Sequence, residues 1–452
     1  MSTVDNLTDG PVGAPDSAAR TGTARGRLRS GSGQAGGRTG RGGLAADRWE
    51  VGSAFPLGLP TGGGWAGPAE EFRLYGSGRQ ALVALLEFGR REHGWTAVHL
   101  PEYYCPEVAD DVAAVLPVHR YDAGPAGVGN PPRVGVDEVL VLVSYFGTPP
   151  VRPPTPTPAA GPTVVVDATH DPLAPWLPHL GADYAFASLR KTLPLPDGGM
   201  LWSTVGAPLP PPPAPSDGQR LAAGTILSAM CLKTAYLGGA GLAKEPYLAG
   251  YADGERRLRS AGVSAVSDLS AQLLHALPVD ELRVRRITNA AVLADRLATL
   301  PGLTARAYPF GVVLECDSHR RREELRRALI ARAVYPAVLW TLRPGESGTR
   351  HLDYSARMLM LHTDARWTER DMARVGTLVR QVVRQEAPPA RTTTAPPART
   401  TTALLATPPA TPIGTAAPVA GTVAVPPLPR PTSGRLRHRS DGNNLPPKGA
   451  PC

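Results

Sequence analysis

The chain has 452 residues, including 50 prolines and 49 glycines. This share of the two residues exceeds that of ordinary globular proteins, so we expect part of the chain not to pack into a core. The 42% of hydrophobic residues still suffices for a sizeable core, which excludes a wholly disordered chain and suggests two folded units with tails. Of the formal net charge of +9, residues 1–48 carry +3 and residues 386–452 carry +5. The part between is nearly neutral, which argues against nucleic-acid binding.

Both ends of the chain lack an apolar pattern. Residues 1–48 consist mainly of Gly, Ser, Thr and Arg, and residues 387–452 begin with tandem APPARTTT repeats and continue through further Pro-rich sequence. Such compositions are typical of disordered segments, and an eight-residue Pro/Thr repeat offers no apolar face for stacking. We therefore predict two disordered tails.

The segment between the tails alternates helix and strand patterns. Residues 79–91 show helical spacing of leucines, and residues 107–116 also favour a helix. Short apolar runs predict strands at residues 97–100, 117–121, 139–145, 163–167, 184–188 and 199–203. Strands with continuous Val and Leu are buried on both faces, which is typical of a mostly parallel sheet covered by helices.

After residue 217 long helical patterns dominate, at residues 219–237 and 279–300. A smaller unit follows, with strand-like and helical segments at residues 311–316, 320–333, 357–362 and 368–384. We expect an α/β fold with a large domain over residues 70–285 and a smaller C-terminal α/β domain over residues 286–385.

Membrane and redox signals are weak. The most apolar run, residues 139–146, is too short to cross a bilayer, and the N-terminus does not combine a positive start with an apolar stretch. The four cysteines lie far apart without a CxxC pair, which favours reduced thiols over a metal knot or a disulfide framework. We expect a cytoplasmic protein with no membrane partner and no bound metal.

Four polar side chains follow the ends of two predicted strands. Asp167 ends one buried strand and His170 comes three residues later, whereas Ser188 and Lys191 follow the next strand. In open α/β sheets the carboxyl ends of the strands form the ligand crevice, so the four side chains are expected to converge. A carboxylate and a lysine in this arrangement match the needs of pyridoxal 5′-phosphate, which takes a lysine amine for its Schiff base and a carboxylate beside its pyridine nitrogen.

A phosphate cradle is predicted before the first helix. In the sequence LYGSGRQAL the glycines allow a tight turn, and the first amides of the following helix attract an anion. Ser77, Gly78 and Arg79 would hold the phosphate there, with Ser188 adding a hydroxyl. The same letters fit a dinucleotide fingerprint with Glu102 further along, but only EEFRLY precedes the glycines where that fingerprint needs a strong buried strand.

The order GSGRQAL, LPEYYCPEV, SYFG, VVVDATH and SLRKTLPLPDGG resembles the DegT-type nucleotide-sugar aminotransferases, pyridoxal-phosphate enzymes of the aspartate aminotransferase fold. The resemblance covers roughly residues 70–385. It departs from many members at two points: Lys191 follows Ser188 by three residues where they have five, and Cys105 stands where an aromatic usually stacks on the cofactor. Tyr103 or Tyr104 could take over the stacking.

The resemblance implies roles for these residues. Lys191 would be the Schiff-base lysine and proton shuttle, Asp167 would pair with the pyridine nitrogen, and His170 would lie near the ring oxygen. It further implies a homodimer that transfers an amino group, with glutamate as the donor, to a small keto substrate such as a nucleotide-linked keto-sugar, in polysaccharide or secondary-metabolite biosynthesis. The alternative is a non-catalytic binding or regulatory protein that keeps the fold.

Overall fold

A computed structural model describes residues 48–386, apart from residues 53, 59–61, 66, 69–70, 131 and 152–160. The predicted disordered tails, residues 1–48 and 387–452, lie outside the described residues except for Arg48.

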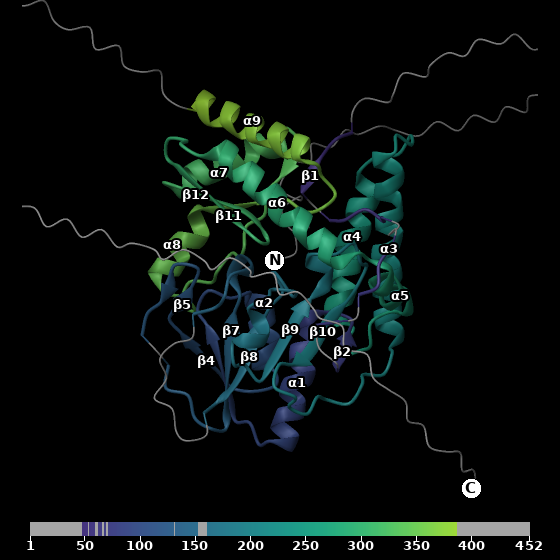
Figure 1. Cartoon of the computed structure of the whole chain (residues 1–452), viewed down its shortest axis with the longest axis vertical. Helices are drawn as coiled ribbons and strands as arrows, with labels where there is room; N and C mark the ends of the chain where they lie inside the picture. Colours follow the sequence, from purple (N-terminus) through teal and green to yellow (C-terminus); the bar gives the residue numbers. More distant parts are fainter. Residues whose placement is uncertain are drawn as a thin grey trace, which may run out of the picture. The chain divides into compact units, whose positions relative to one another are not determined.

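The larger sheet has seven strands in the order β2-β10-β9-β8-β7-β3-β4 (Figure 1). The strands are β2 (Phe72–Tyr75), β3 (Ala97–Pro101), β4 (Val118–Tyr121), β7 (Glu138–Val143), β8 (Thr163–Asp167), β9 (Tyr184–Ser188) and β10 (Gly199–Ser203). Strands β4, β3, β7, β8 and β9 are parallel, and β10 runs antiparallel to both of its neighbours. The predicted mostly parallel α/β sheet is confirmed, and β2 is an additional edge strand.

Each face of this sheet packs into its own core because alternate residues of a strand point to opposite faces. Val139 and Val141 of β7 pack with the leucines of α1 (Gly78–Glu92). Leu140 and Leu142 pack on the other face, where Leu274 of α5 (Asp268–Ala276) closes the core. The run EVLVLV therefore reads as continuously apolar because both faces are covered.

Three further helices surround the larger sheet. Helix α2 (Pro106–Ala113) begins directly after the loop that follows β3 and contacts α1, whereas α3 (Asp217–Leu237) and α4 (Glu245–Ser260) pack on each other. The α3–α4 pair lies at one side of the molecule (Figure 1). Its core contains Ile226, Met230, Tyr247 and Tyr251, and Phe55 of the N-terminal segment packs against it.

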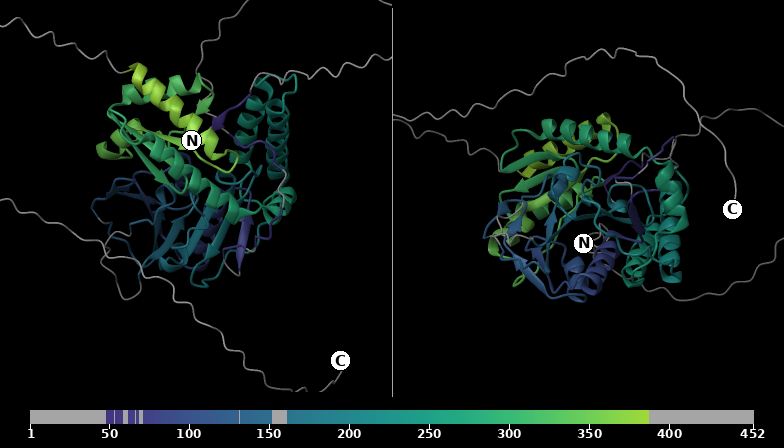
Figure 2. Two further views of the ribbon diagram at one scale, coloured as in Figure 1. Left: turned by 45° about the horizontal axis from the view of Figure 1, so that its top comes forward. Right: turned by 60° about the horizontal axis from the view of Figure 1, so that its bottom comes forward.

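The smaller sheet is antiparallel and consists of β11 (Leu303–Tyr308), β12 (Gly311–Cys316) and β14 (Met358–His362). Its helices are α6 (Val279–Leu297), α7 (His319–Ile330), α8 (Thr349–Arg357) and α9 (Glu369–Glu386). Helix α6 begins in the core of the larger sheet at Val279 and ends in that of the smaller sheet at Leu297, so one rigid element joins the two (Figure 2). The division into residues 70–285 and 286–385 stays a prediction, with its boundary inside α6.

Short elements complete the fold. Strand β1 (Val51–Gly52) pairs in parallel with β13 (Val334–Tyr335), and β5 (Ala123–Gly124) forms a small ribbon with β6 (Gly127–Val128). The segment around β1 is fixed by Glu50, whose carboxylate contacts Lys233 Nζ at 2.7 Å and Lys244 Nζ at 3.1 Å. Among the described residues, no helix is long and apolar enough to cross a membrane.

Candidate active site

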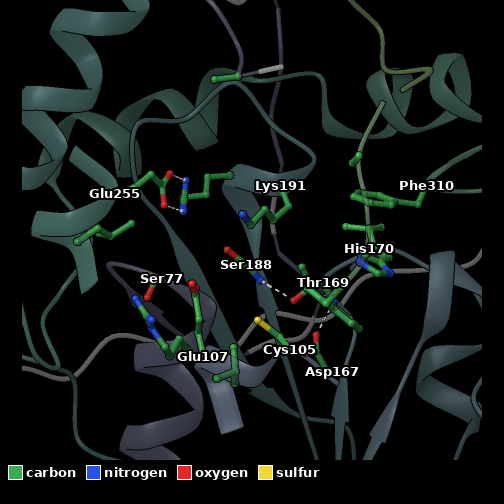
Figure 3. A pocket seen from close by; sticks show the side chains of 18 of the residues that line it. Ser77, Cys105, Glu107, Asp167, Thr169, His170, Ser188, Lys191, Glu255 and Phe310 are labelled. Atoms are coloured by element: carbon green, nitrogen blue, oxygen red, sulfur yellow. Dashed lines mark hydrogen bonds and ion pairs between the residues drawn. The ribbon is translucent and has the colours of Figure 1, made fainter. Parts of the chain in front are cut away.

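A cavity of about 200 Å³ opens at the carboxyl ends of β7, β8 and β9 (Figure 3). Its lining comes from both sheets, from the N-terminus of α1 and from α4. Seven of the predicted site residues line it: Ser77, Arg79, Tyr104, Asp167, His170, Ser188 and Lys191. The cavity thus joins the two predicted motifs, the turn before α1 and the strand ends at residues 167–191.

Asp167 is held at the end of β8 by two donors. The Tyr104 hydroxyl donates to Oδ2 at 2.9 Å, and the Thr169 amide donates to Oδ1 at 3.0 Å. Burial raises the pKa of Asp167, and these hydrogen bonds act in the opposite direction by stabilising the ionised form. Asp167 therefore offers a buried carboxylate in a fixed position to a cation bound in the cavity.

Lys191 ends a short 3-10 turn, Leu189–Lys191, which starts directly after β9. Its ammonium has no hydrogen-bond or ion-pair partner among the described residues, although the side chain lines the cavity. Burial lowers the pKa of Lys191, and the charge of the neighbouring Arg190 lowers it further. A larger fraction of this amine is therefore neutral and nucleophilic than in an exposed lysine.

The charge of Arg190 is compensated by Glu255 of α4, because both terminal nitrogens of Arg190 donate hydrogen bonds to the Glu255 carboxylate. Burial would raise the pKa of Glu255, but the charges of Arg190 and Lys191 lower it overall. The carboxylate therefore stays ionised beside the lysine. Glu255 was not predicted from the sequence, because only the packing of α4 brings it to the strand end.

His170 is neutral and its ring orientation is fixed. Its Nδ1 accepts a hydrogen bond from the Phe146 amide at 2.9 Å, which leaves the proton on Nε2. The ring stacks on Phe310 with the centroids 4.2 Å apart and the planes 19° apart. Burial lowers the pKa of His170 to about 3, assisted by the charges of Lys191 and Arg286.

The turn before α1 approaches the end of β9 closely. Ser77 is the N-cap of α1, and its Oγ accepts from the Gln80 amide at 3.3 Å. A Cβ atom on Gly78 would lie 2.7 Å from the backbone nitrogen of Ser188, so only glycine permits this approach. Gly78 does not line the cavity itself, but it places Ser77 and Ser188 in the same wall. The Arg79 guanidinium pairs with Asp111 at 3.0 Å.

The two tyrosines after β3 have different environments. Tyr104 lines the cavity, whereas Tyr103 does not. Tyr103 is fully buried, its hydroxyl donates to the Leu339 carbonyl, and its ring contacts the rings of Tyr145 and Tyr354. Of the two tyrosines predicted to stack on a cofactor, the structure therefore brings only Tyr104 to the site, together with Cys105.

Several lining residues lie far from the motifs in sequence. Trp340, Phe310 and His362 come from the part of the chain that builds the smaller sheet, and Phe55 comes from the N-terminal segment. None of them was predicted as a site residue, because single aromatic or histidine residues carry no recognisable spacing. The cavity is thus closed by segments that the chain order separates widely.

Comparisons with known proteins give similarity to solved structures alone. No family model and no curated protein matches the chain. DesI with its TDP-sugar product is 17% identical, with a TM-score of 0.44, over 69% of this chain and 80% of that one. The sugar aminotransferase CalS13 from Micromonospora echinospora is 16% identical, with a TM-score of 0.43, over 69% and 87%. The P-protein glycine decarboxylase is 17% identical, with a TM-score of 0.41, over 68% and 70%.

Proposed function

We propose that this chain is a pyridoxal-phosphate-dependent aminotransferase. The observation that carries the proposal is the pairing of a buried carboxylate, Asp167, with an unpartnered lysine amine, Lys191, in one cavity at the ends of adjacent parallel strands. Structural lysines of the interior are ion-paired, as Lys233 is with Glu50. Lys191 has no such partner among the described residues, so stabilising the fold does not account for its position.

The residues present fit the cofactor. Lys191 would hold its aldehyde carbon and Asp167 its pyridine nitrogen. Ser77, Ser188 and the first free amides of α1 would hold its phosphate, because a helix N-terminus attracts anions. The close approach at Gly78 brings Ser77 and Ser188 into one wall, where they would form such a cradle, and His170 offers an N–H donor at Nε2. When bound, the cofactor supplies a conjugated ring that stabilises the electron pair left on a substrate carbon.

Each side chain around the bound cofactor would then have a defined role. Asp167, held by Tyr104 and Thr169, provides a fixed negative charge against the ring nitrogen. The neutral Lys191 amine would bond to the aldehyde carbon of the cofactor with loss of water. When it is not bonded there, the same amine would hold and move a proton beside the substrate. Phe310 and Trp340 give the cavity apolar walls, which would limit the water beside a bound substrate.

We further propose that the amino acceptor is a keto-sugar linked to a nucleotide and that the donor is an amino acid such as glutamate. The support is the resemblance of the motifs at residues 74–199, together with a cavity that mixes apolar walls with several polar groups. A homodimeric state and a biosynthetic role in polysaccharide or secondary-metabolite assembly belong to the same proposal. A cytoplasmic location is also part of it.

The test is chemical labelling of the full-length protein after incubation with pyridoxal phosphate. Borohydride reduction followed by peptide mapping should place the cofactor on Lys191, with visible absorbance that the Lys191→Ala variant lacks. Lys244→Arg is the matched control, because Lys244 pairs with Glu50 away from the cavity, and it should be labelled like the wild type. Labelling of another lysine, or none, would refute the proposal and favour a non-catalytic binding protein.

A further inference from the structure

The ion pair between Arg190 and Glu255 borders the cavity and has no role in the scheme above. Arg190 directly precedes Lys191 in the turn Leu189–Lys191, whereas Glu255 belongs to α4. Glu255 and Lys191 lie on the same cavity (Figure 3). Only 14% of each side chain of the pair is exposed. Apolar side chains often replace such a buried ion pair without loss of stability, so stability alone does not explain it.

Helix α4 holds Glu255 in a fixed place. The helix packs closely on α3, because a Cβ atom on Gly254 would lie 2.3 Å from Ile226 Cγ1. Beyond Glu255, Arg259 of α4 forms an ion pair with Glu107 of α2 at 3.0 Å. The backbone that carries Glu255 is therefore fixed on both sides of this residue, and its carboxylate stays beside the turn that follows β9.

Arg190 engages both carboxylate oxygens of Glu255. Its NH1 donates to Oε1, and its NH2 donates to Oε2 at 2.5 Å, a paired geometry that a guanidinium forms and an ammonium does not. The ammonium of Lys191 has no partner anywhere in the described ranges of the chain. Lys233 shows how a lysine behaves beside an available carboxylate, since its Nζ lies 2.7 Å from Glu50 Oε1.

Arg190 and Glu255 act on Lys191 in opposite directions. Burial and the charge of Arg190 lower the pKa of Lys191, whereas the charge of Glu255 raises it. The interaction is mutual: burial raises the pKa of Glu255, but the charges of Arg190 and Lys191 lower it overall. While Arg190 and Glu255 remain paired, their two charges largely cancel at the amine.

Other titratable groups also surround Lys191. Glu107 is compensated by its ion pair with Arg259. Burial lowers the pKa of His170 to about 3 and that of His362 to about 4, so both imidazoles are uncharged at neutral pH. All these groups stay the same in the variants below, which therefore report on the Arg190–Glu255 pair. The groups are Cys105 and Glu107 at the start of α2, Asp167 at the end of β8, His170 in the loop after β8, and His362 at the end of β14.

We propose that Arg190 is a positioning residue: by engaging both oxygens of Glu255, it keeps this carboxylate from pairing with Lys191. The Lys191 amine is thereby left free for its bond to the aldehyde carbon of the cofactor, which forms with loss of water. This inference rests on the proposed function, because that function supplies the aldehyde. Glu255 in turn compensates the charge of Arg190, so the cavity gains no net charge from the pair.

The test follows acetylation of Lys191 by acetic anhydride in the cofactor-free, full-length protein at increasing pH, measured by peptide mass mapping. Only the neutral amine reacts. In Arg190→Gln the Glu255 carboxylate is left beside the ammonium and stabilises it. The midpoint of acetylation should therefore rise by about one pH unit, and the reaction below the midpoint should be about tenfold slower.

The reverse change should have the opposite sign. Glu255→Gln leaves the charge of Arg190 uncompensated, so the midpoint should fall by about one pH unit. The double variant Arg190→Gln/Glu255→Gln removes both charges and should return to the wild-type midpoint. Arg257→Gln is the matched control, because it breaks an ion pair of α4 with Asp253 outside the cavity and should leave the midpoint unchanged.

The signs of the shifts separate this inference from structural damage. Circular dichroism verifies folding at each pH, and if Arg190→Gln does not fold, the downward shift in Glu255→Gln and its reversal in the double variant still decide. An unchanged midpoint in the single variants, shifts of one sign, or no recovery in the double variant would overturn the inference. Borohydride labelling tests the proposed function separately: a wild type that carries no cofactor on Lys191 refutes that function, whatever the acetylation midpoints are.

Discussion

The close approach of α1 to β9 gives a sharp prediction for Gly78→Ala. The new Cβ would lie 2.7 Å from Ser188 N and 2.9 Å from the Ala187 carbonyl carbon. Both are backbone atoms, so no side chain can rotate away, and the first turn of α1 must shift. Forcing one methyl into such a contact costs about 1–3 kcal/mol. The shift also separates Ser77 from Ser188, so cofactor affinity should fall about tenfold or more through lost phosphate contacts.

Gly224→Ala is the matched control, because a Cβ on Gly224 in α3 meets no atom within 4 Å. Alanine in an open helix position stabilises by about 0.5–1 kcal/mol relative to glycine. Urea unfolding of the cofactor-free proteins followed by circular dichroism gives the stability change, and equilibrium dialysis gives the cofactor affinity. The reasoning is refuted if Gly78→Ala matches the wild type in both measurements, or is stabilised as Gly224→Ala is.

Three further predictions concern buried charges. Glu50→Gln removes the carboxylate that pairs with the buried Lys233, so urea unfolding should show a loss of about 3–5 kcal/mol in the free energy of unfolding. Arg220→Gln, which breaks an exposed ion pair with Asp217, should lose about 1 kcal/mol or less. Equal losses in the two variants would contradict this prediction. Tyr104→Phe removes one hydrogen-bond donor to Asp167 and raises the pKa of Asp167 further. When the pH is lowered, Asp167 of this variant should be protonated at a higher pH than in the wild type. The absorbance of the bound cofactor should therefore also be lost at a higher pH. The pKa of His170 is about 3 in the folded protein and near 6.5 in the unfolded chain. The contribution of His170 to the free energy of unfolding is therefore complete above about pH 6.5 and declines as the pH falls toward 3. The free energy of unfolding of His170→Gln should depend less on pH in this range, and an unchanged pH dependence would count against a neutral His170.

The strands of the larger sheet were predictable because each is a short apolar run. The segments predicted at residues 163–167, 184–188 and 199–203 match β8, β9 and β10 at both ends. The edge strand β2 was missed, since its sequence FRLY is only half-buried and lacks the pattern of a central strand.

Helix α4 was also missed, although its sequence contains a signal. Its buried residues Tyr247, Tyr251, Gly254 and Leu258 recur at helical spacing. Glycine and tyrosine at these positions are weak helix formers, so propensity did not support the pattern. The missed helix carries Glu255, and the ion pair beside Lys191 was missed with it.

By itself, the sequence determined the alternation of strands and helices and the position of Asp167, Ser188 and Lys191 at strand ends. Local patterns suffice for this, because burial on both faces of a strand and the turn that follows it are properties of neighbouring residues. Only the tertiary structure decided that Tyr104 and not Tyr103 faces the cavity, and that Glu255 and His362 line it. These placements depend on how α4, β14 and the N-terminal segment pack against the larger sheet, and such long-range contacts leave no spacing in the chain for a sequence pattern to record.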